Sequence, residues 1–102
     1  MTQVGIDAVE FWSGNLKLDL PGTFAPAQGD DPEKYTKGLG MHDSSLPDVY
    51  EDIVTMAANA SKRLMDRKGL KPDDIGRIDV ATERSFDRAK PVSTYVAACL
   101  EQ

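Results

Sequence analysis

Alternating apolar and polar positions near the start of the chain predict two strands. Residues 16–20 alternate Leu with charged residues, a period of two that favours a half-exposed strand ending at Pro21. The preceding segment, residues 4–11, mixes Val, Ile and Phe with an internal Asp and predicts a strand buried on at least one face. A Ser-Gly-Asn turn at residues 13–15 separates the two strands.

Helical spacing of apolar residues predicts one long helix over residues 49–68. Asp48 is expected to cap its first turn, with Glu51 three residues further on as in a capping box, and Gly69 is expected to end it. The apolar stripe predicted for this helix consists of Ile53, Met56, Ala57, Ala60 and Leu64.

After this helix the chain is expected to turn, form another strand and enter a second helix. Residues 71–76 carry turn signals, and residues 77–82 predict the strand. The second helix is expected to begin near Pro91. The residues predicted to face inward from it are Val92, Tyr95, Val96, Cys99 and Leu100.

Residues 21–46 are rich in Gly, Pro and Asp and show no sustained periodicity. A long irregular segment in a compact domain is usually functional or disordered. Within it, Asp31 can cap one helical turn that has Pro32 at its first position. Gly38 and Gly40 are expected to end that turn.

Strands that alternate with helices indicate an α/β fold with a mixed sheet and packed helices. We expect residues 1–102 to form one partial amino-terminal domain. The last helix reaches Gln102 without a Gly, Asn or Pro stop signal, which predicts a truncated chain. A sheet interrupted there would leave a strand edge open and promote self-association.

Composition narrows the classes of function. A formal net charge of −5 and the absence of Lys/Arg-rich stretches argue against nucleic acid as a partner. No apolar run approaches the ~20 residues that span a bilayer, so no membrane partner is expected. The single cysteine excludes an internal disulfide and is compatible with a reducing cytoplasm, which is the expected location.

Glu83 is the strongest candidate for chemistry in this chain. It ends the predicted strand over residues 77–82, and ligands in open α/β sheets bind beyond the carboxyl ends of strands. One carboxylate at such a point is a candidate general base. Arg84 and Arg88 follow closely, however, and positive charge beside a carboxylate favours its ionised form. No activated nucleophile follows Glu83 in the chain.

Other candidates have more ordinary interpretations. His42 lies beside Asp43 and two serines, but sequence neighbours seldom make a catalytic triad, so a polar loop residue is expected. One His and one Cys far apart do not have metal-ligand spacing, and no metal is expected. Cys99 is expected to be a buried structural residue. Asp31, Lys34 and Lys37 could meet a phosphorylated ligand, although solvated charges are the commoner case.

Four segments resemble 3-hydroxy-3-methylglutaryl-CoA synthase of the thiolase superfamily, in order and over essentially the whole chain. Residues 4–10 resemble its first strand, and residues 51–60 resemble its first long helix. Residues 31–40, DPEKYTKGLG, resemble its D-x-x-K-[YF]-x-x-G-[IL]-G loop. Residues 75–83, IGRIDVATE, resemble the strand that carries its catalytic glutamate. The amino-acid sequence resembles haloarchaeal members of the family most.

The resemblance implies a thiolase-like fold and a condensation of acetyl-CoA with acetoacetyl-CoA in the mevalonate route to isoprenoids. A cysteine takes the acetyl group, a glutamate deprotonates its methyl, and the carbanion attacks the ketone. Glu83 matches the glutamate, and Asp31 and Pro32 match loop positions that contact the acyl-CoA. Cys99 and His42 match neither the catalytic cysteine nor the histidine that positions the second substrate. The resemblance further implies a homodimeric, cytoplasmic enzyme with no cofactor apart from its acyl-CoA substrates.

Arg84 departs from the family pattern, which usually has a small residue there, commonly Ser. Three interpretations remain open. The first is an amino-terminal portion of the synthase, inactive alone because the nucleophile is missing. The second is a related condensing enzyme, either a β-branching synthase or a ketoacyl synthase of the third type. The third is a non-catalytic fragment that self-associates or binds a partner.

Overall fold

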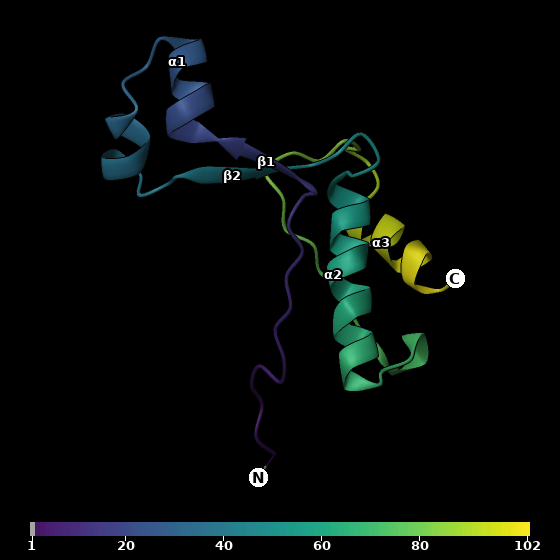
Figure 1. The fold of residues 1–102 in the computed structure, drawn as a ribbon. Helices are drawn as coiled ribbons and strands as arrows, with labels where there is room; N and C mark the ends of the chain where they lie inside the picture. Colours follow the sequence, from purple (N-terminus) through teal and green to yellow (C-terminus); the bar gives the residue numbers. More distant parts are fainter. Residues whose placement is uncertain (1) are drawn as a thin grey trace. The chain divides into compact units, whose positions relative to one another are not determined.

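The computed structural model describes residues 2–102, which form two compact units (Figure 1). Residues 2–12 and Asp52–Gln102 make up unit 1, and Ser13–Glu51 make up unit 2. Unit 1 is therefore discontinuous in sequence, because unit 2 is inserted between its two segments. No helix within residues 2–102 has both the length and the apolarity needed to cross a membrane.

Unit 2 is built on a two-stranded antiparallel sheet of β1 (Leu16–Asp19) and β2 (Asp43–Leu46). Leu16 pairs with Leu46 and Asp19 pairs with Asp43, so the alternating Leu segment does form the predicted strand. Gly14 lies against the end of β2: a Cβ added there would be 2.1 Å from the Leu46 carbonyl oxygen. Only glycine fits this close approach of two backbones.

Short helical turns pack beside this sheet and supply the core of unit 2. They are the π-helical turn η1 (Leu20–Phe24), the helix α1 (Ala25–Gln28) and the π-helical turn η2 (Lys34–Gly38). Leu20, Ala25 and Tyr35 are buried, and Phe24 meets the Tyr35 ring edge-on at 5.9 Å between centroids. The segment expected to be irregular therefore contains a small core of its own.

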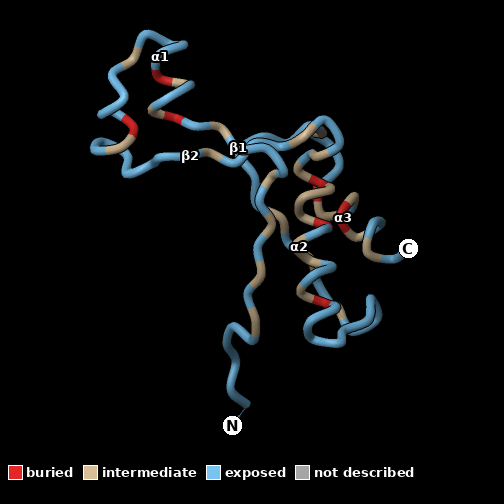
Figure 2. The backbone as a smooth tube through the Cα atoms, viewed as in Figure 1, coloured by how far each residue is buried: buried red, intermediate tan, exposed pale blue. Residues whose placement is uncertain are grey.

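Unit 1 consists mainly of two helices, α2 (Ile53–Lys68) and α3 (Val92–Leu100), with the single turn η3 (Pro72–Asp74) between them. The helix predicted near Pro91 is confirmed as α3. Its buried residues Val92 and Val96 pack against Val54 and Ala58 of α2, and Val96 is only 1% exposed. Figure 2 shows these buried positions where α2 and α3 meet.

The apolar stripe predicted for α2 is displaced by about one residue from the stripe that is buried. Val54, Ala58 and Met65 are buried, whereas the predicted residues are only half-buried. The half-buried residues are Ile53, Met56, Ala57, Ala60 and Leu64. Apolar residues occupy more than one face of α2, and the position of α3 decides which face is covered.

The predicted first turn of α2 is wrong, because Asp52 rather than Asp48 caps the helix. Asp52 Oδ1 accepts from the Thr55 N–H, and Thr55 Oγ1 accepts from the Asp52 N–H, both at 2.8 Å. This reciprocal pair is a capping box, and its hydrogen bonds lower the pKa of Asp52 below its usual 3.8. Glu51 Oε1 does accept from the Asp48 N–H at 3.1 Å, but this contact precedes the helix, and Glu51 also accepts from the Asn15 N–H at 2.7 Å within unit 2.

The end of α2 matches the sequence prediction. Gly69 has φ 68°, a left-handed conformation that glycine adopts without steric cost. Its N–H donates to the Asp66 carbonyl at 3.3 Å, and the Leu70 N–H donates to the Met65 carbonyl at 2.9 Å. This pair of bonds is a Schellman motif, which satisfies carbonyls at the helix end.

Two predicted strands do not form within the described residues. Residues 4–11 and residues 77–82 have no ladder partner, so the mixed sheet expected from them is absent here. A strand needs a second strand to pair its N–H and C=O groups, and periodicity in one segment does not provide that partner.

The basic face of α2 holds the amino-terminal segment instead. Arg67 donates to the Val9 carbonyl at 2.7 Å and pairs with Glu10 at 3.2 Å. Arg63 donates to the Phe11 carbonyl at 3.3 Å, and its guanidinium lies 4.5 Å from the centre of the Trp12 ring. Carbonyls that a ladder would have paired are thus satisfied by arginine side chains.

We expect the chain to self-associate in solution. Val4, Ile6, Val9 and Phe11 are all at least 73% exposed on one segment, and contiguous exposed apolar side chains promote association. Light scattering over a dilution series measures the effect. A monomer at every concentration would contradict the expectation. Val9→Lys is expected to reduce the association, because it places a charge on the exposed segment.

Candidate functional site

Glu83 is exposed at the start of the loop that leads from residue 82 to Pro91. Three residues earlier, Val80 packs against the cluster formed by α2 and α3. The chain therefore leaves the core of unit 1 at Val80 and presents the Glu83 carboxylate to solvent. This is the position that the sequence predicted for a carboxylate, although residues 77–82 are not paired as a strand.

The expected electrostatic conflict at Glu83 is not visible in the structure. Among residues 2–102, Glu83 makes no ion pair with Arg84 or Arg88. The Arg84 N–H donates to Thr82 Oγ1 at 3.2 Å, a local turn that fixes the backbone on both sides of Glu83.

Asp87 organises the rest of this loop. Its Oδ1 accepts from the Ala89 N–H at 2.8 Å and the Lys90 N–H at 3.0 Å, and its Oδ2 accepts from the Tyr95 hydroxyl at 2.7 Å. The Lys90 ammonium lies 4.4 Å from the centre of the Tyr95 ring. Two of these hydrogen bonds shape the turn over residues 87–90, and the third, from Tyr95, joins the loop to α3.

These hydrogen bonds stabilise the ionised form of Asp87. The Lys90 N–H, the Tyr95 hydroxyl and the Ala89 N–H lower the pKa of Asp87 from 3.8 to about 2. The same contact raises the pKa of Tyr95 above its usual 10, because the phenol donates to a carboxylate.

We expect the Asp87 carboxyl to titrate near pH 2, and Tyr95→Phe to raise that pKa toward the ordinary value. A lowered pKa means that the folded state binds fewer protons than the unfolded chain. The contribution of Asp87 to stability is therefore complete above pH 3.8 and is lost as the pH falls through about 2. Carboxyl carbon shifts recorded by NMR measure both pKa values. A Tyr95→Phe curve that superposes on the wild-type curve would contradict the expectation.

Asp31 and Pro32 lie in unit 2, in the loop before η2. Asp31 Oδ1 accepts from the Glu33 N–H at 2.9 Å, and the Asp31 carbonyl accepts from the Lys34 N–H at 3.0 Å. Asp31 thus caps a helical turn that Pro32 begins, as predicted, and both residues are exposed. Glu83 belongs to unit 1, so the predicted site residues are divided between the two units.

The turn after Asp31 is anchored by a carboxylate that the sequence reasoning missed. Asp30 Oδ2 accepts from the Tyr35 hydroxyl at 2.6 Å and from Lys34 Nζ at 2.9 Å. Tyr35, followed by Lys34, lowers the pKa of Asp30 below 3.8, and the bond to Asp30 raises the pKa of Tyr35 above 10. The sequence signal that could have predicted this hydrogen bond is a Tyr that follows an Asp by five residues, across a capped turn.

The other candidate residues, His42, Lys34 and Lys37, are exposed in unit 2. His42 is an exposed loop residue, as expected, and residues 2–102 contain no cluster of three His, Cys, Asp or Glu side chains that could hold a metal. Lys34 and Lys37 pair with Asp30 and Glu33 along the turn, so they are engaged in local ion pairs.

The prediction that Cys99 is buried is wrong: the thiol-bearing residue is exposed. Cys99 lies on the side of α3 that faces α2, in an open depression lined also by Thr55, Ala58 and Asn59.

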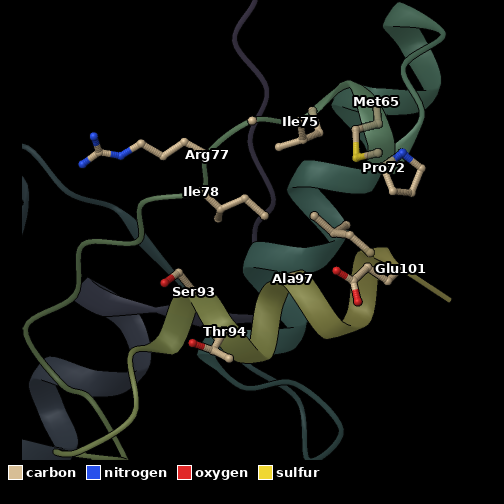
Figure 3. A pocket seen from close by; sticks show the side chains of 11 residues that line it. Met65, Pro72, Ile75, Arg77, Ile78, Ser93, Thr94, Ala97 and Glu101 are labelled. Atoms are coloured by element: carbon tan, nitrogen blue, oxygen red, sulfur yellow. The ribbon is translucent and has the colours of Figure 1, made fainter.

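A cavity in unit 1 does not involve any predicted site residue. It has a volume of about 380 Å³, and Met65, Ile75, Ile78 and Ala97 contribute much of its apolar lining. Figure 3 shows Arg77 pointing away from it. Glu83 does not line this cavity.

Comparisons with known proteins identify the family. Residues 2–102 match the family described as hydroxymethylglutaryl-coenzyme A synthase N terminal. The chain is 76% identical over 102 residues to a Haloferax volcanii hydroxymethylglutaryl-CoA synthase, covering all of this chain and 23% of that protein. The chain thus spans about a quarter of the length of the relative.

Solved structures agree with this match. The structure titled "MvaS in complex with 3-hydroxy-3-methylglutaryl coenzyme A" superposes with a TM-score of 0.85 at 37% identity, over 95% of this chain and 23% of that one. An HMG-CoA synthase complexed with CoA gives a TM-score of 0.73 at 34% identity, over 92% of this chain and 24% of that one.

The helices, the small sheet and these structural neighbours define the amino-terminal part of a thiolase-like fold. The chain belongs to the hydroxymethylglutaryl-coenzyme A synthase N-terminal family, the family of an acyl-CoA condensing acyltransferase. The predicted family and fold class are therefore confirmed. The extent of one partial domain over residues 1–102 and the roles of Glu83, Asp31 and Pro32 stay predictions, and Met1 lies outside the described residues.

Proposed function

We propose that this chain supplies the amino-terminal part of a hydroxymethylglutaryl-CoA synthase that condenses acetyl-CoA with acetoacetyl-CoA in the mevalonate pathway. The observation that carries the proposal is Glu83, an exposed carboxylate at the end of the segment that resembles the catalytic strand of the family. Whole-chain identity of 76% to the Haloferax synthase supports it.

Glu83 is proposed to act as the general base of the condensation. An acetyl group is held as a thioester on a cysteine that the rest of the synthase provides. The Glu83 carboxylate takes one proton from its methyl group, and the resulting carbanion forms a carbon–carbon bond with the ketone of acetoacetyl-CoA. The ketone oxygen then gains a proton, and water cleaves the thioester to release product and free the thiol.

Asp31 and Pro32 are proposed to contact the acyl-CoA. Their loop is ordered by the Asp31 cap and by the Asp30–Tyr35 hydrogen bond, which leaves both residues exposed. A loop fixed in this way can meet a ligand with little further loss of conformational freedom. The two solved neighbours are complexes with 3-hydroxy-3-methylglutaryl coenzyme A and with CoA, which supports a CoA thioester as the ligand.

We further propose that the complete enzyme is a cytoplasmic homodimer that requires no cofactor or metal beyond its acyl-CoA substrates. Proton transfer to a carboxylate and thioester exchange need no redox group. Light scattering at defined concentrations measures the molar mass of the complete enzyme. A mass of two chains is expected, and a mass of one chain would contradict the homodimer.

A graft tests the proposed function. This chain replaces the matching 102 residues of the Haloferax volcanii synthase, and thiol release from acetyl-CoA and acetoacetyl-CoA is followed. We expect the graft to condense the two substrates and the isolated chain to show no turnover. Turnover by the isolated chain, or an inactive graft that folds normally, would contradict the proposal.

A further inference from the structure

The loop that carries Glu83 is attached to the core of unit 1 on its amino-terminal side. Val80 packs against the cluster of Val54, Ala58, Val92 and Val96. Two members of this cluster, Val92 and Val96, belong to α3. The backbone is therefore attached to the core formed by α2 and α3 three residues before Glu83.

Helix α3 holds the loop on the carboxyl side of Glu83. The Tyr95 hydroxyl donates to Asp87 Oδ2 at 2.7 Å, and the Phe86 ring lies 4.9 Å from the Tyr95 ring between centroids. Ser85 Oγ donates to the Asp87 carbonyl at 2.5 Å, which ties the residues nearest Glu83 to this attachment. Tyr95 directly precedes Val96, which is only 1% exposed, so the donor of this bond lies on a well-packed part of α3.

Glu83 thus lies between two attachments, one to the cluster shared by α2 and α3 and one to Tyr95 of α3. A carboxylate at an exposed loop would otherwise sample many positions, and a base displaced by about 1 Å can lose on the order of a hundredfold in rate. We propose that the Asp87–Tyr95 hydrogen bond positions Glu83 for proton abstraction, so that Asp87 and Tyr95 are positioning residues of the condensation step. This inference rests on the proposed function of Glu83.

The two carboxylate oxygens of Asp87 have different roles in the loop. The two backbone bonds to Asp87 Oδ1 shape the turn over residues 87–90, whereas the bond to Oδ2 connects that turn to α3. Loss of the second bond alone would leave the turn formed but free to move relative to the helix. Tyr95→Phe makes this change, because it removes the hydroxyl and keeps the ring against Phe86.

The experiment uses the Haloferax synthase that carries this chain in place of its matching residues. Tyr95→Phe is compared with Tyr50→Phe, since Tyr50 is 87% exposed and makes no hydrogen bond among the described residues. Transfer of labelled acetyl groups to the enzyme is measured without acetoacetyl-CoA. Condensation is then measured in a single turnover after acetoacetyl-CoA is added, and the Tm of each variant is recorded.

We expect Tyr95→Phe to acetylate at the rate of the control and to condense about ten- to a hundredfold more slowly. Equal condensation rates in the two variants would overturn the proposal. A parallel fall in acetylation, condensation and Tm would also overturn it, because that result describes a general loss of structure.

Asp87→Asn provides a second test that keeps the size of the side chain. It is expected to slow condensation while sparing acetylation, and an unchanged condensation rate would overturn the proposal. Glu83→Gln separates the two inferences. If Glu83→Gln condenses normally, the proposed role of Glu83 fails and the positioning role fails with it. If Glu83→Gln cannot condense but Tyr95→Phe condenses normally, only the positioning role fails.

Discussion

Glu83→Gln in the grafted synthase is expected to lower the rate of condensation by about 10²- to 10⁴-fold, the usual contribution of a general base. The amide has the size of the carboxylate but cannot take a proton from the acetyl methyl group. Formation of the acetyl-enzyme needs no such proton transfer from carbon, so its rate is expected to remain within about twofold of the unsubstituted graft.

Rapid-quench measurement of acetyl-enzyme and of product separates the two steps. Glu101→Gln is a matched control, because Glu101 is an exposed carboxylate of the same unit that follows α3. If Glu83→Gln lowers both steps equally, the carboxylate contributes to binding or folding and is not the base of the condensation.

Gly14→Ala is expected to lower the free energy of unfolding of unit 2 by about 3 kcal/mol or more. This is the upper end of the cost of inserting extra volume into a packed site. The new Cβ would lie 2.1 Å from the Leu46 oxygen and 2.8 Å from the Pro47 nitrogen. Both are backbone atoms beside β2, so no side-chain rotation relieves the clash. The pairing of β1 with β2 must shift or open.

Hydrogen exchange of individual amides measures this result. Protection is expected to fall in β1 and β2 and to remain in α2, since α2 packs on α3 within unit 1. Gly38→Ala is the control within unit 2, because a Cβ there meets nothing closer than 4.0 Å. Retained strand protection in Gly14→Ala would show that the two backbones separate at little cost.

Local signals in the sequence were sufficient for the elements that depend on local contacts. The Gly69 cap, the Asp31 turn and the strand over β1 each follow from residues within a few positions of one another. The start of α2 was mispredicted although its signal is also local: Asp48 with Glu51 and Asp52 with Thr55 are both plausible capping pairs. Glu51 is engaged by Asn15, a contact across 36 residues that periodicity cannot reveal.

The expected strands over residues 4–11 and 77–82 failed for a different reason. Their periodicity describes which side chains are apolar, but a ladder also requires a second backbone at the correct distance. The candidate site shows the same limit. Glu83 and Asp31 were identifiable from motifs, whereas the Asp87–Tyr95 bond depends on the packing of α3 and could not be assigned from spacing alone.

The insertion of unit 2 into unit 1 has a consequence for the order of folding. The bond from Arg67 to the Val9 carbonyl joins residues 58 positions apart, so closing that loop from an unfolded chain is entropically costly. The bond from Asn15 to Glu51 brings the two ends of unit 2 together across 36 positions. If unit 2 forms first, the effective loop is less than half as long, which lowers the closure cost by about 1 kcal/mol. Unit 2 then acts as an intramolecular clasp that hastens the docking of the amino-terminal segment onto α2.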